Sequence, residues 1–180
     1  NLVQTPAGPF AGTLALDGSG LNGKVVLAAA GAVQRADVDV TASNARIPGD
    51  TPITIASGTA RATVLLPDAG PSVTGDVRLA GVRQGDISLA NARGRIRYQD
   101  GRGTVALTAD GQSGVPFRMA AQAALAPERI VANLKGDVNG IAVSLDRPAT
   151  VRRVGADWVL DPAIIVVPQG RMRVAGQYGD

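Results

Sequence analysis

Apolar and polar residues alternate over short stretches that recur along almost the whole chain of 180 residues. In residues 72–79, Val73, Val77 and Leu79 fall on one side of an extended strand, and Asp76 and Arg78 fall on the other. Successive side chains of a β-strand point to opposite faces, so this pattern predicts strands with one apolar and one solvated face. Because the pattern repeats from end to end, we expect an all-β fold.

Turn-forming residues separate these stretches at intervals of roughly 8–12 residues, a spacing typical of antiparallel all-β proteins. Asp-Gly pairs are a strong signal, because both residues tolerate the positive φ angles of a tight hairpin turn. The pattern predicts an elongated, mostly antiparallel meander sheet of about twelve to fourteen strands. The predicted turns are at residues 17–20, 48–50, 67–71, 100–101, 110–111 and 168–170.

Residues 118–125 are the best candidate for a helix, because they are rich in alanine. However, Val115, Phe117 and Met119 alternate with other residues just before and within this run, and strand patterns lie on both sides. We therefore expect a strand here.

Residues 1–180 are expected to form a single all-β segment. The most plausible seam is at residues 67–71, but the composition does not change across it. The chain starts at Asn1 without a methionine and ends at Asp180 within a strand pattern. These features favour a segment excised from a longer protein.

The sequence contains no cysteine and no histidine. This excludes disulfides and thiol chemistry, and it removes the usual general base of enzymes. The carboxylates lie mainly in predicted turns or on the solvated sides of strands, where tuning by burial is not expected. Asp37 and Asp39 share one strand face and could suggest calcium, but a pair of exposed acids is the simpler interpretation. The sequence therefore predicts no enzyme, no cofactor and no metal.

The basic residues are almost all arginine, and the formal net charge is +3. Arg93, Arg95 and Arg97 share one strand face, which raises the question of nucleic acid. Aromatic residues make up only 3% of the chain, too few for base-stacking platforms. We expect these arginines to form a solvated outer face and the chain not to bind nucleic acid.

The apolar residues are mostly small, with 30 alanines and 21 valines beside 23 glycines. Two sheet faces about 10 Å apart would be poorly filled by such side chains. A space of that width would suit a lipid acyl chain, each buried methylene contributing about 0.8 kcal/mol. The alternative is a thin, closed sandwich or solenoid without a ligand.

A more specific pattern lies near the C-terminus. Residues 155–160, Gly-Ala-Asp-Trp-Val-Leu, are followed by a short apolar strand at 162–166 and by Gly-Arg-Met-Arg-Val-Ala-Gly at 170–176. This succession resembles the repeating unit of the TamB-like proteins, which belong with the AsmA-like proteins of the Gram-negative envelope. The pattern covers about residues 129–180, and the rest of the chain shares its general composition.

The resemblance implies a sheet folded into a taco-like groove with an apolar lining. It also implies a periplasmic location, with an N-terminal inner-membrane anchor outside this segment. Proteins of this family are associated with phospholipid transport towards the outer membrane. They are also associated with the assembly of outer-membrane proteins, including autotransporters, with a barrel partner of the TamA type that would bind outside this segment.

Combined with the alternation, the resemblance predicts one continuous trough that contacts phospholipid acyl chains. The competing hypothesis is a structural or adhesive extracellular β module, such as an autotransporter passenger or a surface repeat, with no ligand. The residues predicted to line the trough are Val73, Val77, Leu79, Val105, Leu107, Ile130, Leu134, Ile141, Val143, Leu145, Met172 and Val174.

Overall fold

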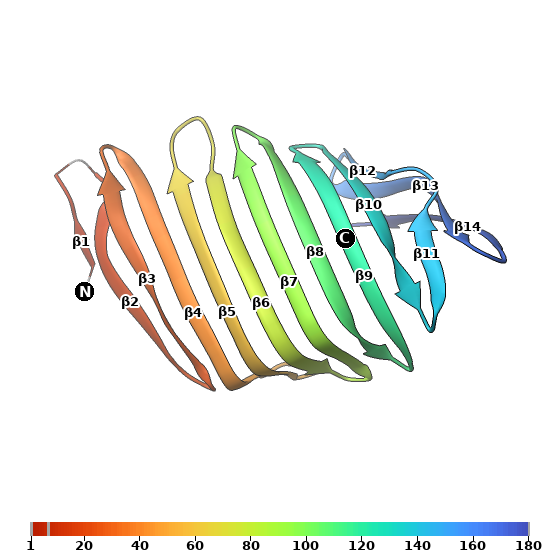
Figure 1. The fold of residues 1–180 in the computed structure, drawn as a ribbon. Coiled ribbons are helices and arrows are strands. Elements are labelled where there is room, and N and C mark those ends of the chain that lie inside the picture. The colour runs from red at the N-terminus through yellow and green to blue at the C-terminus, as the bar shows by residue number, and fades with distance from the viewer. Residues whose placement is uncertain (1, 7, 180) are drawn as a thin grey trace.

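The computed structural model describes residues 2–6 and 8–179, and across these ranges it contains fourteen strands and no helix. All fourteen strands belong to one sheet (Figure 1). The strands are β1 (Leu2–Gln4), β2 (Phe10–Gly18), β3 (Leu21–Ala30), β4 (Val33–Ile47), β5 (Ile53–Leu66), β6 (Ser72–Gln84), β7 (Ile87–Gln99), β8 (Arg102–Ser113), β9 (Val115–Ala126), β10 (Arg129–Val138), β11 (Ile141–Leu145), β12 (Ala149–Val154), β13 (Asp157–Val167) and β14 (Gly170–Tyr178).

The sheet is an antiparallel meander from β1 to β11, in which each strand pairs with the strands next to it in sequence. The order changes only at the C-terminal end, where β12 pairs with both β10 and β13, and β13 also pairs with β11 and β14. The predicted all-β antiparallel fold is confirmed. Residues 118–125 lie in β9, paired with β8 and β10, so the prediction of a strand there is also confirmed.

The turn prediction at residues 100–101 is confirmed, because Asp100 and Gly101 have φ angles of 51° and 73° and join β7 directly to β8. The prediction at 110–111 is wrong, since both residues lie inside β8. Gly111 is opposite Leu89, and a Cβ at this glycine would collide with the backbone oxygen of Ser88. This glycine therefore serves a close approach of two backbones rather than a turn.

The two strands predicted at 155–160 and 162–166 form a single strand, β13, so this expectation is wrong as well. The pairing with β14 is irregular between Leu160 and Ala163. Pro162 lies in this irregularity, and proline, which has no backbone N–H, is tolerated at such a bulge. The strand thus passes through Pro162 instead of ending there.

A second irregularity runs across four long strands. The paired positions skip one residue in each strand, namely Asn44 in β4, Ala56 in β5, Gly81 in β6 and Ala90 in β7. Asn44 and Gly81 have φ angles of 48° and 62°. The register is the same on both sides of the skipped positions from β4 to β7, and it shifts only between β7 and β8. Irregularities aligned across neighbouring strands bend a sheet along a line, and this line is called the crease below.

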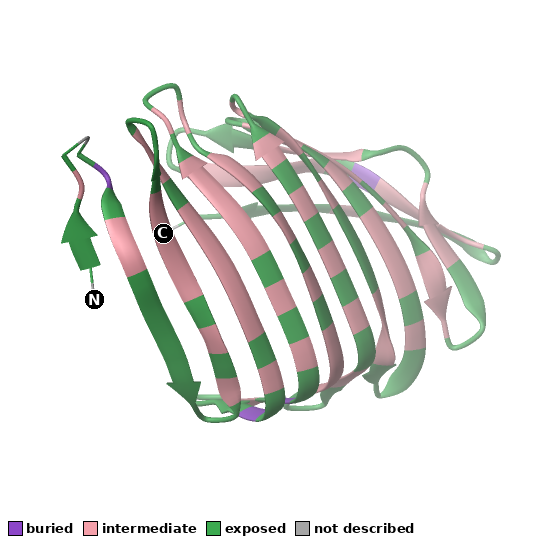
Figure 2. Cartoon of the chain, turned by 60° about the vertical axis from the view of Figure 1, so that its left-hand side comes forward, coloured by how far each residue is buried: buried purple, intermediate pink, exposed green. Residues whose placement is uncertain are grey.

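The molecule has almost no enclosed core. Apart from Pro9 in the loop before β2, the buried apolar residues of the described chain are Ala45, Ile55 and Ala163. The first two lie next to the crease, and Ala163 follows the irregularity of β13. A side chain on a single-layer sheet is buried where neighbours crowd the inside of a bend, so the sheet bends towards the face that carries these residues. Figure 2 shows the few buried segments, and Figure 1 shows β12–β14 turned behind the long strands.

Candidate functional site: the apolar face

The strand register brings the predicted trough residues together on one face of the sheet. Directly paired positions form a row from Val77 of β6 through Gly94 and Leu107 to Ala121 and Leu134 of β10. Directly opposed residues of an antiparallel pair point to the same side. The three buried residues share this side as well, so it is the face towards which the sheet bends. It is called the apolar face below.

Neighbouring rows extend this face to both ends of the sheet. In the C-terminal strands, Leu145 is opposite Ile165, which is opposite Met172. Taken together, the registers place all twelve predicted residues on the apolar face: Val73, Val77, Leu79, Val105, Leu107, Ile130, Leu134, Ile141, Val143, Leu145, Met172 and Val174. Their proposed role in contacting lipid stays a prediction.

Glycines on the apolar face let larger side chains lie flat against the sheet. A Cβ added at Gly94 would lie 2.9 Å from Cγ1 of Val77 and 3.1 Å from Cδ2 of Leu107. A Cβ added at Gly58 would lie 2.6 Å from Cδ2 of Leu79. The large side chains therefore fill the space above the glycines from the side. The resulting surface is apolar and of low relief.

No second layer covers this surface among the described residues. Leu107 is 50% exposed and Met172 is 54% exposed, and most of the other exposed large apolar side chains share their face. The ten longest strands average about 40 Å in length and are spaced about 4.8 Å apart, so they present roughly 2,000 Å². Soluble monomers rarely expose contiguous apolar patches larger than a few hundred Å². A face of this size requires a physical explanation.

The opposite face, called the polar face, carries the charged side chains. Arg35 donates two hydrogen bonds to the carboxylate of Asp37, at 2.7 and 2.9 Å, and the Thr63 hydroxyl donates a third at 2.7 Å. The hydrogen bond from Arg35, followed by that from Thr63, lowers the pKa of Asp37. The same ion pair raises the pKa of Arg35. Asp39 lies near Arg61, at 3.5 Å, so both aspartates considered for calcium face arginines instead.

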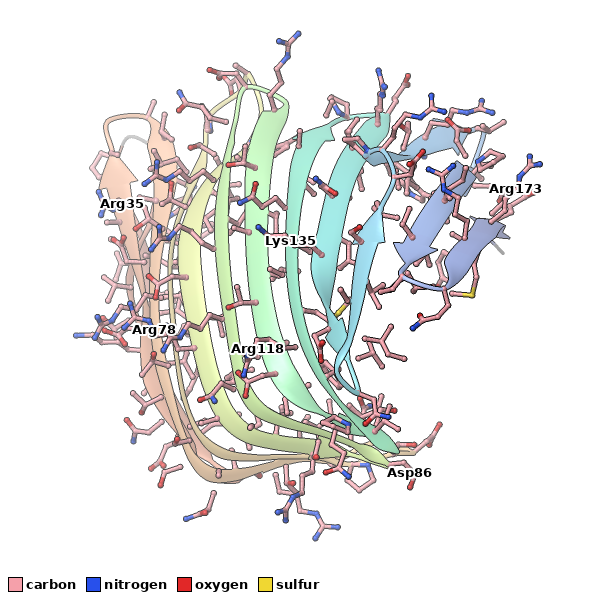
Figure 3. The ribbon with its side chains drawn as sticks, turned by 45° about the vertical axis from the view of Figure 1, so that its right-hand side comes forward. Arg35, Arg78, Asp86, Arg118, Lys135 and Arg173 are labelled. Atoms are coloured by element: carbon pink, nitrogen blue, oxygen red, sulfur yellow. The ribbon has the colours of Figure 1, made fainter. Side chains whose placement is uncertain are left out.

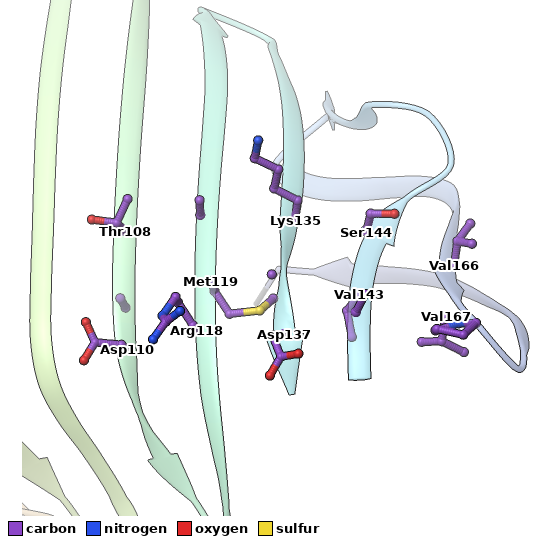
Figure 4. Close-up of a pocket in the computed structure, with 15 residues that line it drawn as sticks. Thr108, Asp110, Arg118, Met119, Lys135, Asp137, Val143, Ser144, Val166 and Val167 are labelled. Atoms are coloured by element: carbon purple, nitrogen blue, oxygen red, sulfur yellow. The ribbon is translucent and has the colours of Figure 1, made fainter. Parts of the chain in front are cut away.

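The hollows of the surface were not predicted. Five are lined mainly by the polar face. One of about 700 Å³ spans β8 to β11 and the end of β13, with Lys135 in one row and Arg118 between two aspartates in the next (Figure 4). Long charged side chains stand up from this face and enclose space. The leaning side chains of the apolar face do not, so that face is an open surface rather than a pocket.

Among the residues that the structure describes, no three His, Cys, Asp or Glu side chains gather as a metal site. The same residues contain no helix long and apolar enough to cross a bilayer.

Comparisons with protein-family models, with curated proteins and with solved structures found no match for this chain. The residues and their arrangement define a single-layer antiparallel sheet with one predominantly apolar face.

Proposed function

We propose that the apolar face carries phospholipid acyl chains, and that the chain is a segment of a TamB-like protein that conducts lipid across the periplasm between the inner and outer membranes. The observation that carries the proposal is a face of roughly 2,000 Å² that no other part of the described chain covers. Acyl chains are the simplest partner for such a surface, because they are apolar, flexible and tolerant of low relief. Assembly of outer-membrane proteins is the related use of the same face.

The energy of contact supports this assignment. A fully buried sixteen-carbon chain would contribute on the order of 10 kcal/mol before losses, at about 0.8 kcal/mol for each methylene. A chain lying on an open face buries about half of its surface, so about 5 kcal/mol is expected. That is enough to hold a lipid and weak enough to let it move along the face. The bends at the crease and in β13 increase this contact, because both turn towards the apolar face.

A structural or adhesive β module without a ligand accounts less well for the same observations. Such a module gains stability by closing its apolar surface into a core. Here the described chain buries only Ala45, Ile55 and Ala163, besides Pro9. An uncovered apolar face also promotes aggregation unless something occupies it.

Site-specific photo-crosslinking in cells that make the full-length protein tests the proposal. The crosslinking amino acid is placed at Leu107 or Val143 on the apolar face. Thr108 and Ser144, the next residues in the same strands, are the controls on the polar face. We expect phospholipid adducts from the first pair and few from the second. Equal capture from both pairs, or capture from neither, would contradict a lipid-conducting face.

The two cargo classes separate in the same experiment. Adducts that contain lipid support transport, whereas adducts of higher mass that contain an outer-membrane protein support a role in its assembly. The N-terminal anchor in the inner membrane and the TamA-type partner belong to the proposal as properties of the longer protein.

A further inference from the structure

The polar face carries a dense arginine cluster over β6 and β7. Arg78 of β6 is directly opposite Arg93 of β7, so their Cα atoms are about 5 Å apart. Arg95 and Arg97 follow Arg93 at every second residue and point to the same side. These four residues are called the arginine cluster, and Figure 3 labels one of them, Arg78, together with Arg35 of β4.

Acidic residues of the described chain compensate only part of the cluster's charge. Asp76, opposite Arg95, is the acid placed among the four arginines, which leaves an excess of three positive charges. The ion pairs of the described residues involve Arg35, Arg61, Arg147, Arg152 and Arg171, and none involves a member of the cluster. All four members are exposed, so their guanidinium groups are free to meet a ligand.

The direct opposition of Arg78 and Arg93 is unfavourable in itself. Like charges at opposed positions of an antiparallel pair destabilise the sheet. On the same face the chain places opposite charges together elsewhere, as in the row in which Arg118 lies between Asp110 and Asp137. The opposed arginines thus depart from a local pattern of charge pairing. An anion bound between them would remove the repulsion.

The surface between these side chains is hollowed. A hollow of about 240 Å³ is lined by Asp76, Arg78, Arg93, Arg95 and Thr108 among others. A second, of about 520 Å³, continues along Arg95 and Arg97 towards Gln122 and Asn133. Guanidinium groups present a planar fork of donors that matches phosphate oxygens. Hydroxyl and amide groups nearby add neutral donors.

We propose that the arginine cluster binds phosphate groups, either those of phospholipid head groups or those of a soluble phosphate compound. The site lies on the face opposite the acyl-chain surface. It is therefore independent of the proposed lipid conduit, and a lipid seated on the apolar face does not reach it.

Binding is measured with two probes on the purified chain. Titration calorimetry with sodium pyrophosphate reports soluble phosphate. Flotation with phosphatidylcholine vesicles, with and without phosphatidylglycerol, reports head groups. The R78Q/R93Q double variant removes the opposed pair, and R95Q/R97Q removes the other two arginines. R35Q/R61Q is the matched control, since it removes two charges from the same face at arginines that already face aspartates.

We expect R78Q/R93Q and R95Q/R97Q each to weaken binding about tenfold or more, and the control to change it less than about threefold. The melting temperature should not fall in R78Q/R93Q, because the substitutions relieve the repulsion between the two opposed arginines. A response to phosphatidylglycerol but not to pyrophosphate assigns head groups, and the reverse assigns a soluble phosphate. The L107R variant should keep this phosphate binding while capturing less lipid from the crosslinking position at Val143. This result would separate the phosphate site from the proposed lipid conduit.

Two results would overturn the proposal. One is the absence of binding to both probes by the unchanged chain. The other is an equal loss in the control and the cluster variants, which would mean that only the general charge of the face matters.

Discussion

The open apolar face makes a quantitative prediction about charged substitutions. Replacing Leu107 by arginine puts a charge on the face at a side chain that is half exposed. Fully burying a leucine contributes about 1.5–3 kcal/mol, so the half-buried side chain accounts for about 1 kcal/mol. The stem of arginine retains part of that contact while its head reaches water. We therefore expect L107R to lower the free energy of unfolding by about 1 kcal/mol or less.

The same substitution at Ile55 should behave differently. Ile55 is 8% exposed and lies against the crease, where the bend closes around it. A charge there has no path to water without opening the bend, so I55R should cost about 4 kcal/mol or more. Q122R, on the polar face and opposite the uncharged Ala106 and Asn133, should change stability by less than about 0.5 kcal/mol.

Urea denaturation followed by far-UV circular dichroism measures the three variants against the unchanged chain. We expect the free energies of unfolding of I55R and L107R to differ by about 3 kcal/mol. If L107R costs as much as I55R, the face is covered in solution and the open-face interpretation is wrong. Repeating the urea denaturation at several protein concentrations shows whether a second copy of the chain covers the apolar face.

Three further predictions concern the crease, the acid response and metal binding. Gly81→Ala should cost about 1–2 kcal/mol in urea denaturation, because φ is 62° and the new Cβ would lie 2.7 Å from that of Ala56. Gly170→Ala is the matched control, because nothing lies within 4 Å of the added Cβ. If both substitutions cost the same free energy of unfolding, the backbone at the crease has no special requirement for glycine. Asp37→Asn should lower the melting temperature at neutral pH. The lowered pKa of Asp37 means that its carboxylate stabilises the fold above the ordinary aspartate pKa of about 3.9, and that this contribution is lost as pH falls through the lowered value. The difference between the variant and the unchanged chain should thus close in acid, and a constant difference from neutral to acid pH would show another cause. Elemental analysis of the purified chain should find no stoichiometric metal, because the carboxylates are dispersed, and one bound metal per chain would refute this.

Much of the fold follows from local pattern. Strict alternation assigned the side of each predicted trough residue, because in a meander every strand has a neighbour that keeps the alternation in step. The same argument outweighed the helical preference of the alanines at 118–125. Local pattern could not locate the turn between β8 and β9. Asp110 and Gly111 look like a turn in sequence, but they lie within β8, where Gly111 is needed because the backbone at Ser88 comes too close for a side chain.

The crease is visible in the sequence as a break in the alternation of apolar and polar residues. In β6, the apolar side is occupied by odd-numbered residues up to Leu79 and then by Val82, and in β4 the side of Ala42 passes to Ala45. A change of phase within a strand marks a bulge. Its alignment across four strands depends on register, which one sequence does not provide. The arginine cluster is similar, since Arg93, Arg95 and Arg97 are evident in sequence but the opposition of Arg78 is not.

Strands β2 to β9 each pair only with their sequence neighbours, and this has a consequence for how such a molecule changes in size. Energies in a sheet of this kind add up from neighbour to neighbour, as in a linear array of repeats. Removing or duplicating one hairpin shifts the sheet length by about 10 Å and leaves every other pairing unchanged. A single strand cannot be added in this way, because it would reverse the direction of all that follow. The length of the apolar face is therefore adjustable in steps of one hairpin.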